Sequence, residues 1–125
     1  MKLHDYEIEK VIIEMIISNE GFQKLVGDNI FPVYIEKDTK GDAVYYDSEI
    51  GDPEMCKMGN VRSVMHFYIS AVCTNMDSSN EIIGIIQDII EGDFKNPYMR
   101  IRAVGSTKEG ADFKYAKTMD FLIEW

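Results

Sequence analysis

The feature that most constrains the fold is an extended segment followed directly by an amphipathic helix, over residues 61–92. In residues 61–74 (VRSVMHFYISAVCT), six of the seven odd positions are apolar, which is the alternation of a half-buried β-strand. Five isoleucines then recur at helical spacing and form one apolar stripe, namely Ile82, Ile85, Ile86, Ile89 and Ile90. Because such a stripe needs a surface to pack against, the two elements together predict a helix packed on a β-sheet.

Both ends of this helix carry sequence signals. Ser78 is followed three residues later by Glu81, which is the spacing of a capping box, and Gly92 follows the last stripe residue as a stop signal. The predicted helix therefore covers residues 79–91. A helix of this length can cross one face of a small sheet and bury its whole stripe.

A second amphipathic helix is predicted over residues 5–19, where the same spacing is occupied by Ile8, Val11, Ile12, Met15 and Ile16. Gly21 is expected to close this helix. The apolar residues that follow predict a short further helical turn, which ends at Gly27. Two amphipathic helices are therefore available to cover a sheet.

Further strands complete the pattern. They are predicted from alternating, β-branched and aromatic residues at 30–35, 43–50, 98–104 and 113–125. Pro32 cannot donate to a strand ladder and so limits the first of them to a sheet edge. The polar, turn-rich segments between strands are predicted to be exposed loops at residues 36–42, 51–60 and 105–112.

The order of these elements indicates the fold class. Strands that follow one another through turns favour antiparallel pairing, and the last two predicted strands form a hairpin. We therefore predict an α+β fold, a two-layer sandwich with a mostly antiparallel sheet of about four to five strands and two amphipathic helices packed on one face. At 125 residues, the chain is expected to form a single domain over residues 1–125.

Charge and cysteine content restrict the possible partners. Thirteen basic against 22 acidic residues give a net charge of −9, which disfavours specific binding to nucleic acid. The N-terminal segment carries acids where an export signal carries bases, and Glu14 interrupts its apolar run, so neither export nor membrane insertion is expected. Cys56 and Cys73 belong to no metal-binding spacing and are expected to be free thiols of a reduced cytoplasm.

The chain offers one candidate for acid–base catalysis. His66 lies in the middle of the predicted central strand on its more polar face, but no nucleophile, oxyanion donor or metal-ligand pattern accompanies it. Arg100 and Arg102 could bind an anion, although pairing with acidic residues of a neighbouring strand is the favoured interpretation. No catalytic, cofactor-binding or metal-binding residue is therefore predicted.

Three stretches of the chain resemble one protein family. Residues 25–32 (LVGDNIFP) look like a segment that follows the first helix in the tail-completion, or tail-terminator, proteins of long-tailed bacteriophages and prophages. That segment reads Leu-Val-Gly-Asp, a usually basic residue, Ile, an aromatic and Pro, and Asn29 departs from it at the basic position. Residues 67–77 (FYISAVCTNMD), which lead into the isoleucine helix, and residues 120–125 (DFLIEW) are similar to the family's strand-then-helix unit and closing strand. The resemblance spans nearly the whole chain.

The resemblance implies a structural virion protein of the phage tail, assembled in the bacterial host cytoplasm and without enzymatic activity or cofactor. Its implied partners are other copies of itself in a ring, expected to be a hexamer, together with the tail tube protein and the head-tail connector protein. Such a ring would stop tube polymerisation and help to join tail to head. The net charge of −9 agrees with this role, because acidic groups around a DNA path repel phosphate.

Contacts with neighbours are expected in the predicted loops, since a ring needs two different surfaces on each copy. Met55 and Met58 are candidates because methionine adapts to a partner surface. Lys108 and Glu109 are candidates in the last predicted turn. The alternative for the two methionines is a loop that folds back onto its own domain.

Three other interpretations stay open on the sequence alone. One is a head-tail joining protein of the same machinery. Another is a small cytoplasmic α+β ligand-binding or regulatory module, which would show a concave apolar pocket with a few convergent polar groups. The third is a small enzyme that uses His66.

Overall fold

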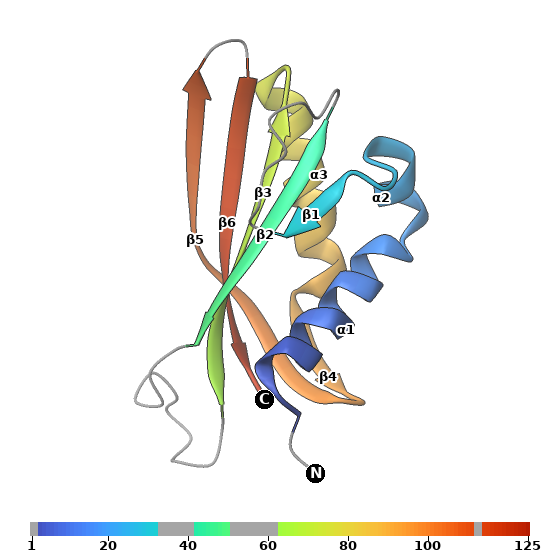
Figure 1. Cartoon of the computed structure of the whole chain (residues 1–125), viewed down its shortest axis with the longest axis vertical. Coiled ribbons are helices and arrows are strands. Elements are labelled where there is room, and N and C mark those ends of the chain that lie inside the picture. Colours follow the sequence, from blue (N-terminus) through green and yellow to red (C-terminus); the bar gives the residue numbers. More distant parts are fainter. Residues whose placement is uncertain (1–2, 33–41, 51–62, 112–113) are drawn as a thin grey trace.

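The computed structural model describes residues 3–32, 42–50, 63–111 and 114–125. These residues form an α+β fold, in which helices lie against one face of a curled, mostly antiparallel six-stranded sheet (Figure 1). The helices are α1 (Asp5–Ile17), α2 (Glu20–Leu25) and α3 (Met76–Ile90). The strands are β1 (Ile30–Pro32), β2 (Ala43–Ile50), β3 (Val64–Cys73), β4 (Gly92–Lys95), β5 (Tyr98–Ala111) and β6 (Lys114–Glu124). The predicted fold class is confirmed, and the sheet has six strands instead of the expected four to five because no strand was predicted at β4.

The strand order across the sheet is β1-β2-β3-β6-β5-β4. β3 lies between β2 and β6 and pairs with both in antiparallel register, whereas β1 runs parallel to β2. β1 occupies one edge of the sheet, as Pro32 in that strand predicted. Within the described ranges, no helix is long and apolar enough to cross a membrane.

The core lies between the central strands and the helices. The predicted alternation of β3 is confirmed, because its buried side chains on the helix side are Met65, Phe67, Ile69, Ala71 and Cys73. α3 packs across β3 and β6 with its isoleucine face, of which the buried members are Ile82, Ile83, Ile86 and Ile90. α1 packs against α3 through the buried Ile8, Ile12 and Ile16. One continuous apolar layer therefore joins sheet and helices.

The start of α3 differs from the prediction. Its N-cap is Asn75, whose side-chain oxygen accepts the backbone N–H of Ser78 at 2.8 Å. The helix therefore begins at Met76, three residues before the predicted start, and the predicted capping box from Ser78 to Glu81 is wrong. Both Asn and Ser are good N-cap residues, and Asn75 is the N-cap here because a start at Met76 adds a further turn to the helix.

Two other helix ends test the glycine signals. α1 ends at Ile17, and Gly21 lies inside α2, so the prediction that Gly21 closes the first helix is wrong. Gly27 has φ of 65°, a left-handed conformation that favours glycine, and it follows α2 as predicted. Gly92 follows the end of α3 as predicted, with φ of 145°, and begins β4.

Replacing the cap should separate the two candidates for the start of α3. Asn75→Ala removes the acceptor of the Ser78 N–H and should lower the free energy of unfolding by about 1 kcal/mol. Ser78→Ala is the matched control, because no side-chain cap at position 78 is formed, and it should change stability by less than about 0.5 kcal/mol. Urea denaturation followed by circular dichroism measures both. A larger loss from Ser78→Ala than from Asn75→Ala would contradict this helix start.

β5 is longer than predicted. The strand continues from Tyr98 to Ala111, so the prediction of a turn over residues 105–112 is wrong for its described part. The ladder with β6 shifts register between Ala103 and Gly105, which is a β-bulge. Just before this shift, the Glu91 carboxylate at the end of α3 accepts the Ala103 N–H at 2.7 Å, and this hydrogen bond lowers the pKa of Glu91. The bulge is therefore anchored to the helix layer.

Candidate assembly surface

The side of the sheet that faces away from the helices is here called the open face. On β3 it carries every second residue, namely Val64, His66, Tyr68, Ser70 and Val72. Val64 is buried beside Leu122 of β6 in a small apolar cluster of its own. The centre of the open face is polar, since the Ser70 and Thr118 hydroxyls hydrogen bond at 2.6 Å across β3 and β6.

Three carboxylates converge on this open face and are named the acidic patch: Asp47, Glu49 and Asp120. Asp47 and Asp120 flank Tyr68 from the two neighbouring strands, and Glu49 lies opposite His66. Burial raises the pKa of Tyr68, and the charges of Asp120, Glu49 and Asp47 raise it further. The sheet register therefore concentrates negative charge that is dispersed along the sequence.

His66 is held by its neighbours on the open face. Its Nδ1 lies 2.8 Å from Asp120 Oδ1, and its ring stacks on Tyr68 with centroids 5.8 Å apart. The nearby Ser70 hydroxyl pairs with Thr118 instead of with the imidazole. In the described parts of the chain, no hydroxyl or thiol is hydrogen bonded to His66, so the arrangement of nucleophile and base that covalent catalysis requires is not formed there.

A shallow groove of about 300 Å³ lies beside the β-bulge on the same face. It is lined by Tyr68, Gly105, Ser106, Thr107, Thr118 and Asp120. Carbon atoms supply most of the surface that lines the groove, and hydroxyl and carboxylate groups supply the rest. Among the described residues, no group of three or more His, Cys, Asp or Glu is placed to hold a metal ion.

The predicted contact residues Lys108 and Glu109 lie on β5 beyond the bulge, where residues 104–110 are exposed. Glu109 is in register with Ala116, and Lys108 is in register with Lys117 of β6. The outer edge of β5 beyond Ile101 has no strand partner in the described chain. Both residues are thus accessible to a neighbour, although on a strand instead of the predicted turn. Met55 and Met58 lie outside the described residues.

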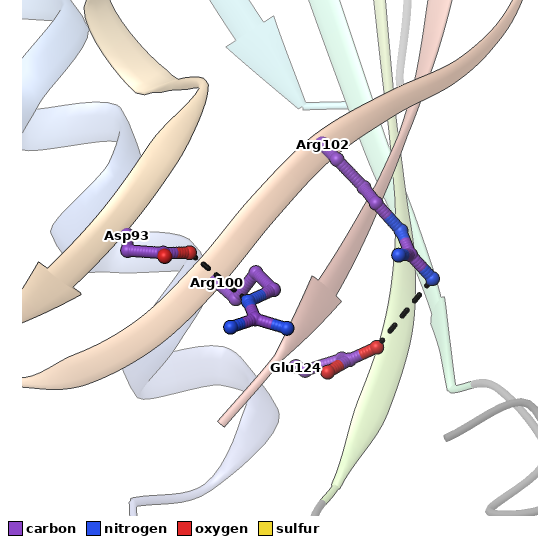
Figure 2. Close-up of polar contacts among 4 residues, drawn as sticks. All are labelled: Asp93, Arg100, Arg102 and Glu124. Carbon is purple, nitrogen blue, oxygen red and sulfur yellow. Dashed lines mark hydrogen bonds and ion pairs between the residues drawn. The ribbon is translucent and has the colours of Figure 1, made fainter. Parts of the chain in front are cut away.

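The two arginines of β5 form the predicted cross-strand pairs (Figure 2). Arg100 Nε donates to Asp93 Oδ1 of β4 at 3.0 Å, which raises the pKa of the guanidinium. Arg102 Nη2 lies 3.6 Å from Glu124 Oε1 of β6, a carboxylate that is buried. Both guanidinium groups are paired with carboxylates, so neither arginine is free to bind an anion on this part of the open face.

Sequence reasoning missed Lys117 and the acidic patch as candidate contact residues. The strand of Lys117 was predicted, and so were the strands of Asp47 and Asp120. The pairing of β3 with β2 on one side and β6 on the other brings the three carboxylates of the acidic patch together, and the β5–β6 ladder places Lys117 opposite Lys108. Alternation within one strand carries no information on the order of the strands.

Comparisons with known proteins place the fold. No protein-family model matches the chain. No curated protein matches it by sequence. Among solved structures, a chain described as "Virion of native gene transfer agent (GTA) particle" is similar, with a TM-score of 0.62, 16% sequence identity and 90% of each chain covered. At this identity, the likeness shows that the two chains share their fold.

Proposed function

We propose that this protein is a structural component of a phage-type virion, which caps the end of the tail tube as a ring, stops tube polymerisation and helps to join tail to head. No enzymatic activity is part of this role. The observation that carries the proposal is the fold shared with a virion protein over 90% of both chains. The tail-terminator resemblance of residues 25–32, 67–77 and 120–125 supports the same role independently, because it rests on sequence.

The surface chemistry supports a ring subunit. An open face with a polar centre and three clustered carboxylates is suited to polar contacts with a neighbouring protein surface. The exposed end of β5 lies at the opposite end of the molecule from the termini, so it can reach a neighbour without disturbing the core (Figure 1). These features leave each copy with two chemically different surfaces, as a head-to-tail ring requires.

Electron microscopy of particles tests this role. Deleting the gene should give tails of irregular, overgrown length without heads, and supplying the intact chain in trans should restore normal tails. A frameshift near the start of the same gene is the matched control, because it removes the protein while leaving the neighbouring genes in place. Normal-length tails with heads attached in the absence of the protein would contradict the proposed function.

A further inference from the structure

A pair of lysines, Lys108 and Lys117, lies toward the exposed end of β5 and its partner strand β6. Lys108 and Lys117 are directly opposite each other in the antiparallel ladder, which places two like charges side by side. Such a pair destabilises an isolated sheet. No described carboxylate lies within ion-pair distance of either side chain, whereas the two arginines lower on β5 are both paired. Among the described residues, no carboxylate therefore neutralises the charge of the two lysines.

The lysine pair and the acidic patch lie on opposite sides of the sheet. Lys117 is in register with Ala71, a buried residue on the helix side of the sheet. Because Lys108 is opposite Lys117, both lysines project from the helix side, near the exposed end of β5. The acidic patch faces away from the helices. A copy cannot bring its own lysines onto its own patch, because the sheet separates them. A second copy can.

We infer that Lys108 and Lys117 of one copy bind the acidic patch of a second copy, and that this contact repeats around the ring. The inference rests on the proposed function, which requires the chain to meet itself, and it names the surfaces that meet. Each copy then offers its lysines once and its acidic patch once. A heterologous contact of this kind closes into a ring when its rotation permits, and otherwise forms an open filament.

Charge complementarity also argues for a second copy over other partners. The chain carries a net charge of −9, so two copies repel each other unless their opposite charges are aligned. The lysine pair is a local positive group on this acidic molecule, and it is exposed at residue 108 and half-buried at residue 117. Alignment of the two surfaces gives the contact one orientation, and salt should weaken it by screening.

Charge reversal tests the contact. In Lys108→Glu/Lys117→Glu, the acidic patch of a neighbour meets like charge, and the association constant of the purified chain should fall by about tenfold or more. The matched control is Lys10→Glu/Lys24→Glu, which changes the net charge equally at two exposed helix positions. This control should change the association constant by less than about threefold, because it alters only the long-range repulsion. Sedimentation velocity over a series of subunit concentrations, at low and high salt, measures all variants.

A charge exchange makes the test specific. Asp47→Lys/Glu49→Lys alone should weaken association, and the combination of these changes with Lys108→Glu/Lys117→Glu restores the net charge of −9 and should restore association. Thermal unfolding of each variant shows that the chain is folded. Lys108→Glu alone should raise the unfolding temperature, because it places opposite charges across the β5–β6 ladder.

The possible results separate the contact from the proposed function. The contact is overturned if Lys108→Glu/Lys117→Glu and the control Lys10→Glu/Lys24→Glu lose association equally. It is also overturned if the charge exchange does not restore association. An intact chain that stays monomeric at every concentration and salt also overturns it. In each of these cases, normal tail closure in particles would still support the capping role, whereas overgrown tails only in Lys108→Glu/Lys117→Glu particles would support both.

Discussion

Phe67→Ala is expected to lower the free energy of unfolding by about 3–5 kcal/mol, because it leaves a cavity at the centre of the core. Phe67 is fully buried in the middle of β3, in register with Ser48 on one side and Phe121 on the other. Its ring also lies 6.1 Å from that of Tyr46. Neighbouring strands hold these groups in place, so the site cannot collapse to fill the space.

The matched control removes the same atoms from the sheet edge. Phe31 lies on β1, is partly exposed and contacts Tyr45 with ring centroids 5.9 Å apart. Phe31→Ala should lower the free energy of unfolding by about 1 kcal/mol, since water already reaches part of the ring. Urea denaturation followed by tryptophan fluorescence gives both values. Equal losses from the two substitutions would contradict the placement of Phe67 at the core centre.

Ile86→Asp is expected to prevent stable folding at neutral pH. Ile86 is fully buried on the face of α3 that packs against β3 and β6. A carboxylate there loses its hydration without a partner, which should lower the free energy of unfolding by about 4 kcal/mol or more. Loss of the near-ultraviolet circular dichroism signal, or a strong shift of the urea midpoint, measures the effect.

Gly84 provides the control for this change on the same helix. It is exposed, and a side chain added there would meet no atom within 4 Å. Gly84→Asp introduces the same residue and the same charge two positions away, and it should leave stability within about 1 kcal/mol of the unaltered chain. A folded Ile86→Asp variant with unaltered stability would show that the isoleucine face of α3 is not the buried one.

The elements that the sequence predicted well are those whose burial is one-sided. In β3 the buried side chains alternate along the strand, and in α3 they recur at helical spacing. These two patterns in the sequence were therefore enough to find both elements. β2 was predicted at residues 43–50 with the bounds it has in the structure. The start of α3 was missed because Asn75 and Ser78 are both good caps, and local sequence does not rank them.

The end of β5 was missed for a different reason. Residues 105–110 (GSTKEG) have the composition of a turn, and their exposure removes the alternation that would mark a strand. The ladder with β6 holds them extended, and this tertiary pairing overrides local preference. For the same reason Lys108 was predicted as a contact residue without its partner Lys117, whose position opposite it follows only from the ladder.

The most direct test of the capping role is a cryo-electron microscopy reconstruction of the intact particle that contains this protein. We expect one ring of this chain between the end of the tail tube and the head connector, with the lysine pair of each copy on the acidic patch of the next. Copies repeated along the tube, or a mature particle that lacks the chain, would contradict it.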